Sequence, residues 1–161
     1  MLKKIMICAA LAAQIQAGTL DGIVVAVTDG DTLKMLTNDK REIKIRLAKI
    51  DAPEKSQAFG QASKKALSDI CYKQHLHVEI ETIDRYGRTV GTVTCKGIEA
   101  NLEQIKNGMA WVYVKYTKDQ KYIEAEKKAK EEKAGLWKEP TATPPWEFRR
   151  NAHTLSEQPK S

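Results

Sequence analysis

The sequence feature that most constrains the fold is a short alternating stretch that ends at a proline. Ile43, Ile45 and Leu47 alternate with polar or small residues, which is the period-two pattern of a strand with one buried face. Pro53 lacks a backbone N–H and cannot continue a ladder of strand hydrogen bonds. We therefore expect this strand to end near Asp51, where the chain must turn.

The same stretch carries residue types that suit a metal ion and a phosphate. Arg46 should point away from the buried face, and its planar guanidinium can bond two phosphate oxygens at once. Asp51 and Glu54 supply carboxylates and Ala52 supplies a backbone carbonyl, and calcium prefers such hard oxygen ligands. Taken alone, the stretch is explained better as the charged end of a strand on a soluble domain.

Two further stretches favour chemistry over that simpler explanation. An Asp29-Gly30 pair lies between two apolar runs, which indicates a hairpin and places Asp31 at the start of its second strand. The segment 84–88 lies between two more strand-like runs and ends in Arg88, a second arginine that can reach a phosphate. Three separate turns therefore offer carboxylates and guanidinium groups.

These three motifs resemble the thermonuclease (staphylococcal nuclease) family. The matching residues are D-G-D-T at 29–32, R-L-x-x-I-D-x-P-E at 46–54 and D-x-Y-G-R at 84–88, in that order and spacing. The similarity runs from about Val24 to Trp137. It implies an α+β fold that is mainly β, an OB-fold five-stranded barrel with about three packed helices. It also implies calcium-dependent cleavage of DNA and RNA.

The resemblance implies one calcium site. Asp31 and Asp51 match the family's calcium-binding carboxylates, and the main-chain carbonyl of Ala52 stands where the family uses that of a threonine. Water would complete a shell of 6–8 oxygens, as is usual for calcium. Asp29 matches an acid beside the metal shell, although its role as a turn residue explains it equally well.

The resemblance also implies catalytic roles for three residues. Arg46 and Arg88 match the two arginines that hold the scissile phosphate, and Glu54 matches the carboxylate that orients or deprotonates the attacking water. A lysine cannot replace either arginine, because it lacks the planar fork.

Tyrosines complete the implied nucleotide site. Tyr86 and Tyr116 match tyrosines of the nucleotide pocket, where hydroxyls bond a terminal phosphate and rings stack on a base. A role at the edge of the core is an equal alternative for Tyr116. A further pocket tyrosine of the family falls on Val114, next to Tyr113, so base preference stays open.

The first 17 residues read as a signal peptide. They carry Lys3 and Lys4, the short apolar run Ile5–Ala13, and a small residue, Ala17, at the end. A disordered or helical N-terminus is the alternative. Export predicts a secreted or periplasmic protein that does not stay in the membrane once the signal is cleaved.

Removal of that segment leaves two cysteines, Cys71 and Cys95. An even pair in an exported protein predicts a disulfide, here between the end of a helix and the end of a strand. Two buried thiols are the alternative.

Composition excludes several classes of protein. The chain has 161 residues, 30% of them charged, and a net charge of +6, which fits one soluble domain that can bind nucleic acid. The three histidines do not cluster, and two cysteines are too few for a cysteine-based zinc site.

Hydrophobic periodicity predicts the order of the elements along a domain that spans 18–138. We expect strands over 19–28, 32–37, 41–50, 76–81 and 88–95, and helices over 56–71, from Asn101 with a capping box, and over 121–134. The tail 139–161 should dock through Trp146 and Phe148 and be disordered after Arg150.

The sequence therefore predicts a monomeric, calcium-dependent endo- and exonuclease. Water would attack phosphorus and the bond to the 5′-oxygen would break, leaving 3′-phosphates. Single-stranded DNA and RNA should be preferred, because a base must reach the pocket unstacked. The alternatives are a catalytically inactive nucleic-acid-binding OB-fold module and a structural protein unrelated to nucleic acid.

Overall fold

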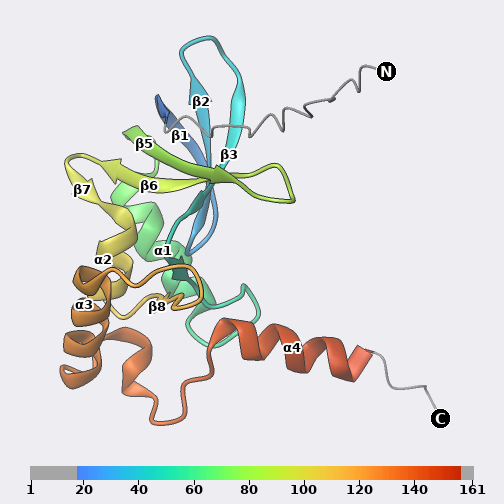
Figure 1. Ribbon diagram of the computed structural model, residues 1–161, viewed down its shortest axis with the longest axis vertical. Coiled ribbons are helices and arrows are strands. Elements are labelled where there is room, and N and C mark those ends of the chain that lie inside the picture. Colours follow the sequence, from blue (N-terminus) through green and yellow to red (C-terminus); the bar gives the residue numbers. More distant parts are fainter. Residues whose placement is uncertain (1–17, 157–161) are drawn as a thin grey trace, which may run out of the picture.

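The computed structural model describes residues 18–156 (Figure 1). None of the described helices is long and apolar enough to cross a membrane. The elements follow in the order β1 (Thr19–Asp29), β2 (Thr32–Thr37), β3 (Glu42–Leu47), β4 (Ile50–Asp51), α1 (Gly60–Cys71), β5 (His75–Ile83), β6 (Thr89–Cys95), β7 (Ile98–Glu99), α2 (Ala100–Lys106), β8 (Trp111–Val112), α3 (Gln120–Glu131), the 3-10 helix η1 (Gly135–Lys138) and α4 (Pro145–Ser156).

Five strands close into a barrel, as the sequence predicted. Their order is β3-β2-β1-β5-β6, and the parallel pairing of β3 with β6 joins the two ends of the sheet. Ile45 lies opposite Thr89 and Leu47 opposite Gly91 in that pairing. The buried side chains of alternate strand positions fill the interior, among them Val24, Leu33, Met35, Ile45, Leu47, Val78 and Val93.

The predicted strand over 41–50 is two strands. Residue Lys49 has φ 69°, so the chain turns between β3 and β4. The broken ladder is replaced by two long-range bonds, from Ala48 N to Gly91 O (2.8 Å) and from Tyr113 N to Lys49 O (2.8 Å). This turn aims β4 out of the barrel toward β8, with Asp51 opposite Trp111.

Helix α1 begins at Gly60, four residues later than predicted. Residues 55–59 form turns in which Gln57 N bonds Glu54 O and Gly60 N bonds Gln57 O, both at 2.9 Å. A Cβ at Gly60 would lie 2.0 Å from Glu54 O, so only glycine lets the helix start so close to this loop. Residues 55–59 therefore form a loop of turns and not the start of the predicted helix over 56–71.

The capping box predicted at Asn101 is wrong. Helix α2 begins at Ala100, and the Asn101 side chain is fully buried in the barrel wall. It accepts a bond from Val93 N (2.9 Å) and donates to Ala48 O (2.9 Å) and Gly91 O (3.1 Å). Buried backbone groups at the end of β3 need partners, and this demand outweighs helix capping.

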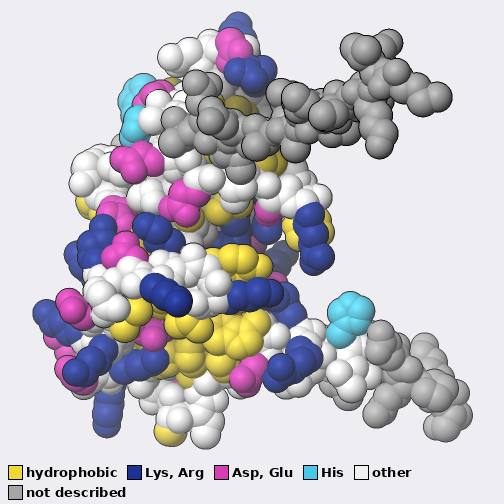
Figure 2. Space-filling view, in the orientation of Figure 1, with side chains coloured by type: hydrophobic (Ala, Val, Ile, Leu, Met, Phe, Trp, Pro, Cys, Tyr) yellow, Lys and Arg dark blue, Asp and Glu magenta, His cyan; other side chains and the backbone are white. Residues whose placement is uncertain are grey.

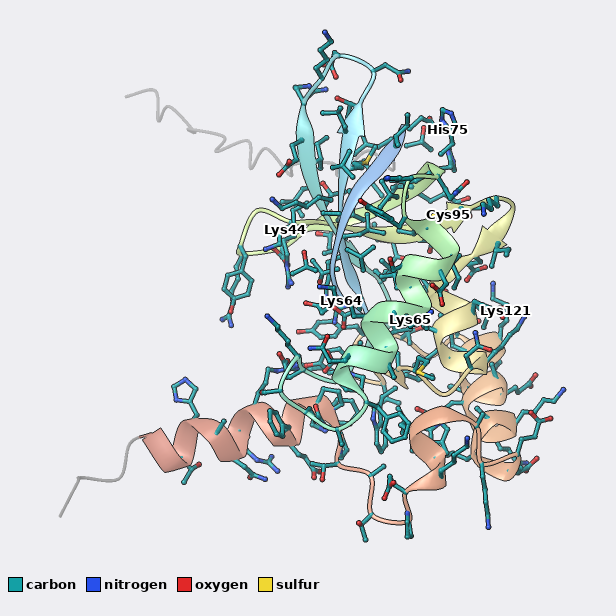
Figure 3. All side chains as sticks on the ribbon, turned by 180° about the vertical axis from the view of Figure 1, so that it is seen from behind. Lys44, Lys64, Lys65, His75, Cys95 and Lys121 are labelled. Carbon is teal, nitrogen blue, oxygen red and sulfur yellow. A yellow bond between two sulfur atoms is a disulfide. The ribbon has the colours of Figure 1, made fainter. Side chains whose placement is uncertain are left out.

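The disulfide between Cys71 and Cys95 is confirmed. It joins the last residue of α1 to the last residue of β6, with the Cα atoms 5.4 Å apart. Figure 3 labels Cys95 beside the end of α1.

The prediction of disorder after Arg150 is wrong for residues 151–156, which belong to α4. The predicted signal peptide and residues 157–161 lie outside the described residues. Trp146, in the first turn of α4, stacks on Tyr113 with ring centres 5.4 Å apart and planes 5° apart, and meets Trp111 edge-on at 5.8 Å. Figure 2 shows hydrophobic side chains gathered on the surface between α3 and α4, beside Lys and Arg side chains. These ring contacts hold the helix against the domain.

Candidate active site

The first carboxylate of the site is Asp31, in the two-residue turn between β1 and β2. Its Oδ2 accepts a bond from Ala52 N at 2.7 Å and its Oδ1 accepts one from Thr32 Oγ1 at 3.0 Å. The turn lies tightly against α1, because a Cβ on Gly30 would fall 1.7 Å from Ser63 Oγ. Two segments 21 residues apart are thus joined at one carboxylate.

A buried glutamine fixes the same turn from the other side. Gln104 Nε2, on α2, donates to Gly30 O at 2.7 Å and to Ser63 O at 3.0 Å. The turn is therefore held by α1, α2 and β4 together, so the position of Asp31 does not depend on the hairpin alone.

Arg46 bridges the two carboxylates that the sequence predicted as metal ligands. Its Nη2 lies 3.2 Å from Asp31 Oδ2 and 3.2 Å from Asp51 Oδ1, and its Nη1 donates to Leu47 O at 2.6 Å. The Arg46 side chain is only 13% exposed, on the side of β3 opposite the buried Ile45. One nitrogen shared by both carboxylates places Asp31 and Asp51 side by side.

The structure adds an arginine that the sequence did not single out. Arg149, on α4, donates from Nη2 to Asp51 Oδ2 (2.8 Å) and from Nη1 to Asp51 Oδ1 (3.2 Å) and Glu54 Oε1 (2.7 Å). It is 98 residues from Asp51 in the chain. No local pattern around Arg149 distinguishes it from its neighbour Arg150. The one signal in the sequence was the expected docking of Trp146 and Phe148, which places this segment near the domain.

The site holds more carboxyl groups than cations. Asp31 and Asp51 both pair with Arg46, and Asp51 and Glu54 both pair with Arg149. Asp29 adjoins Asp31 through the bond from Asp31 N and forms no ion pair with either arginine in the described part of the chain. Burial, the Asp31 charge and a hydrogen bond with Asp31 raise the pKa of Asp29 to about 7. Burial also raises the pKa of Asp51, and the Asp31 charge adds to this, although the bond from Arg149 opposes it.

The pKa of Arg149 is also raised, but for a guanidinium a raised pKa favours the charged form. Burial alone would lower the pKa of Arg149, but its bonds to Asp51 and Glu54 raise it overall. It therefore stays charged beside the two acids.

Arg88 and Tyr86 do not contact this cluster. Arg88 Nε pairs with Asp84 Oδ2 at 2.7 Å within the β5–β6 hairpin, and its guanidinium lies 5.5 Å from the centre of the Tyr86 ring. The hairpin nevertheless lies next to the site strand, because Thr89 pairs with Ile45 of β3. The Tyr86 ring is 68% exposed, so it is available to a ligand.

Tyr116 is also exposed and lies apart from the carboxylates. It meets Tyr113 edge-on, with ring centres 4.7 Å apart, and is 64% exposed. Tyr113 in turn carries Trp146 on its face.

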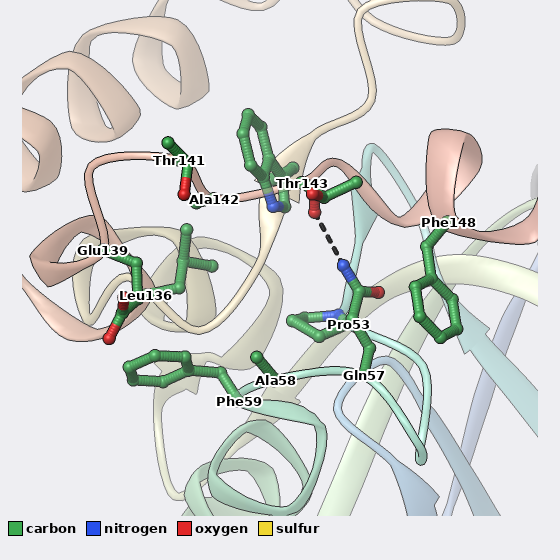
Figure 4. A pocket seen from close by; sticks show the side chains of 11 residues that line it. Pro53, Gln57, Ala58, Phe59, Leu136, Glu139, Thr141, Ala142, Thr143 and Phe148 are labelled. Carbon is green, nitrogen blue, oxygen red and sulfur yellow. Dashed lines mark hydrogen bonds between the residues drawn. The ribbon is translucent and has the colours of Figure 1, made fainter. Parts of the chain in front are cut away.

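A cavity lies between Pro53 and the loop that follows it on one side and the chain leading into α4 on the other (Figure 4). Its volume is about 320 Å³, and its apolar wall includes Pro53, Phe59, Trp111 and Phe148. Gln57 Nε2 donates to Thr143 O at 2.6 Å across its edge, which links the loop after Glu54 to the tail.

Comparison with known proteins identifies the family of this chain. The sequence profile described as "Staphylococcal nuclease homologue" matches residues 44–139. A Shigella flexneri protein named "Micrococcal nuclease" is 40% identical over 140 residues, which cover 80% of this chain and 80% of that protein. The chain belongs to the staphylococcal nuclease family.

Other relatives have similar coverage. A Haemophilus influenzae protein named "Uncharacterized endonuclease" is 46% identical over 127 residues, 79% of this chain and 71% of that protein. An Escherichia coli protein named "Protein ParB" is 36% identical over 150 residues, 86% of this chain and 84% of that protein. The chain is accordingly a nuclease of the staphylococcal nuclease family.

The family implies a bound metal ion, and the donor set here fits a hard divalent cation. Two adjacent carboxylates, Asp31 and Asp51, belong to a cluster whose acids outnumber its cations, so added positive charge is favourable. Within residues 18–156, no three or more His, Cys, Asp or Glu side chains form a group that could hold a metal ion.

Proposed function

We propose that the chain is a calcium-dependent endo- and exonuclease that hydrolyses DNA and RNA. The observation that carries this proposal is the shared contact of Arg46 with Asp31 and Asp51, with Glu54 three residues further along the chain. A guanidinium beside paired carboxylates is suited to a phosphate and a divalent ion that meet at one place.

Arg46 and Arg88 would bind the scissile phosphate from two sides. Arg46 is already fixed by Leu47 O and by two carboxylates, so little of its freedom is lost when a phosphate binds. Arg88 would exchange its partner Asp84 for the phosphate. Both guanidiniums would stabilise the charge that grows on the phosphoryl oxygens in the transition state.

Glu54 would position the attacking water. Its side chain is 39% exposed, so water can reach it, and its loop is fixed by the bond from Glu54 N to Gln57 Oε1 at 3.1 Å. A carboxylate is a weak base, so orientation of the water contributes along with proton removal. The bond from phosphorus to the 5′-oxygen would break, which leaves products with a 3′-phosphate.

Asp31, Asp51 and the carbonyl of Ala52 would hold one calcium ion, which as a Lewis acid would polarise a phosphoryl oxygen. Ala52 is well placed because its N–H is bonded to Asp31 Oδ2, which fixes its peptide beside both acids. Asp29 accepts a bond from Asp31 N at 3.2 Å and would orient the turn that carries this ligand.

The exposed tyrosines would bind the nucleotide. Tyr86, on the hairpin with Arg88, and Tyr116, beside Tyr113, are largely exposed and could meet a base or a terminal phosphate. Stacking requires an unpaired base, so single-stranded DNA and RNA should be cut faster than duplex DNA.

The test is digestion of heat-denatured DNA and of RNA by the mature protein, with calcium or with EGTA. Cleavage only with calcium and 3′-phosphate ends identified by mass spectrometry are the expected results. Binding without cleavage would instead establish the inactive nucleic-acid-binding module, and cleavage in EGTA would overturn the calcium dependence.

We also propose that the protein is exported to the periplasm or beyond the cell as a monomer. The Cys71–Cys95 disulfide supports an oxidising compartment. N-terminal sequencing of the exported protein should show loss of a signal peptide, and light scattering should give the mass of one chain. Two alkylatable thiols in unreduced exported protein would contradict the bridge.

A further inference from the structure

The feature not explained by the family's motifs is the contact between α4 and the active-site carboxylates. Arg149 lies ten residues beyond the last position matched by the family profile, which ends at 139. None of the three motifs that identify the family includes it. Its partners, however, are Asp51 and Glu54, two acids to which the proposed function assigns metal binding and water positioning.

The contact with Arg149 involves both carboxylate oxygens of Asp51. Arg149 reaches both Asp51 oxygens, at 2.8 and 3.2 Å, while Arg46 shares the Oδ1 atom at 3.2 Å. The Asp51 side chain is only 3% exposed. A divalent ion that binds Asp51 therefore needs an oxygen that Arg149 now holds.

Arg149 is held by a separate anchor and not by its charge alone. Trp146, one helical turn earlier, stacks on Tyr113 and meets Trp111 edge-on. The loop after Glu54 is tied to the chain before α4 by the bond from Gln57 to Thr143 O. Residues three apart lie on the same side of a helix, so the docking of Trp146 aims Arg149 at the carboxylates.

In the absence of metal, Arg149 balances part of the negative charge of the carboxyl groups at this site. The cluster of Asp29, Asp31, Asp51 and Glu54 would retain a single cation, Arg46, without Arg149. A guanidinium can neutralise part of this repulsion when a metal ion is not bound, and it must yield when a metal ion supplies two positive charges.

We propose that Arg149 is a second resident cation of this site, beside Arg46, and that a divalent metal ion must displace it from Asp51 and Glu54 in order to bind. This proposal rests on the calcium dependence of the proposed function. Arg149 thereby sets the calcium concentration at which the nuclease becomes active. When calcium binds, the ion pairs between Arg149 of α4 and the two carboxylates break.

The test is calorimetric titration of calcium into the metal-free protein, without nucleic acid, for the wild type and for Arg149→Gln. The matched control is Arg150→Gln, which removes the same charge from the next residue of α4, since Arg150 forms none of the ion pairs among residues 18–156. Removal of the competitor should lower the calcium Kd about fivefold, the factor equivalent to about 1 kcal/mol for a partly exposed ion pair.

Two further variants separate competition from a general effect on folding. Arg149→Lys keeps a positive charge and should give a Kd between those of the wild type and Arg149→Gln. Trp146→Ala keeps Arg149 but removes its anchor, so it should also bind calcium more tightly. In the wild type, hydrogen exchange of the α4 amides should become faster when calcium is added.

The outcomes distinguish this proposal from the proposed function. If the wild type binds calcium but Arg149→Gln binds it with the same or lower affinity than Arg150→Gln, Arg149 does not compete with the metal and the proposal is wrong. If the wild type binds no calcium and cuts DNA in EGTA, the calcium dependence itself fails and the proposal fails with it.

Discussion

Two sites on this molecule differ in how well their carboxyl groups are paired with cations and hydrogen-bond donors. At the candidate active site, Asp31, Asp51 and Glu54 share two guanidiniums, and the pKa values of Asp29 and Asp51 are raised. Glu99, on β7, has two partners of its own. It accepts a bond from Lys121 Nζ at 2.8 Å and one from the Tyr122 hydroxyl.

The pKa of Glu99 moves in the opposite direction. Burial alone would raise it, but the bonds from Lys121 and Tyr122 lower it overall. Burial and the bond to Glu99 raise the pKa of Tyr122, so its hydroxyl keeps its proton and remains a donor. The Glu99 cluster is satisfied and stabilises the junction of β7 with α3, whereas the active site is left short of positive charge. A cation bound there, as the proposed function requires, would relieve that shortage.

The largest effect should come from Arg46→Lys. Lysine keeps the charge but loses the planar fork that can bond two phosphate oxygens at once, so nuclease activity should fall by about 10³–10⁵-fold. The thermal unfolding midpoint and the circular dichroism spectrum should stay close to those of the wild type. Near-normal turnover would show that Arg46 does not bind the scissile phosphate.

A similar but smaller loss is expected for Arg88→Lys, on the order of 10³-fold in activity. Arg88 approaches the site from the hairpin and is now paired with Asp84, so Asp84→Asn serves as the control. That variant keeps the arginine and frees its side chain, and it should retain most activity in the same assay of denatured DNA. Equal losses in both variants would point to the hairpin structure and not to the guanidinium.

Mutation of Glu99, whose carboxylate is paired with Lys121 and Tyr122, should change stability but not nuclease activity. Glu99→Gln should lower the free energy of unfolding at neutral pH by about 1 kcal/mol, with nuclease activity unchanged. Because the folded state lowers the pKa of Glu99, its stabilisation is present above the unfolded value of about 4.3 and is lost as pH falls through the folded value. Urea unfolding from pH 7 to pH 3 should show the two proteins converge at the acid end; a constant difference would assign the effect to packing.

The smallest effect completes the comparison. Asp29→Asn removes one negative charge from the crowded site but keeps an oxygen that can accept the bond from Asp31 N. In calcium-free buffer it should raise the free energy of unfolding by less than about 1 kcal/mol, the opposite sign to Glu99→Gln. Calcium titration should show weaker binding in the same variant. A loss of stability would mean that Asp29 serves mainly as a turn residue.

Local patterns were sufficient for most of the barrel and for the motifs of the site. The alternation of Ile43, Ile45 and Leu47 predicted both the strand and the outward direction of Arg46, and the Asp29-Gly30 pair predicted the hairpin. The errors lie where distant segments meet. The Asn101 side chain bonds the buried backbone next to β3 and in β6 and does not cap a helix. Helix α1 begins only at Gly60, where Glu54 O leaves no room for a side chain.

The sequence by itself predicted the strands from periodicity and turn chemistry, the five-stranded barrel from the resemblance carried by three motifs, and the disulfide from the even number of cysteines left after the expected signal peptide. Only the tertiary structure decided that α4 continues past Arg150 and that Arg149 lies on Asp51 and Glu54. The physical reason is that an ion pair across 98 residues depends on where Trp146 docks. A surface arginine carries no local sign of the carboxylates that it will meet.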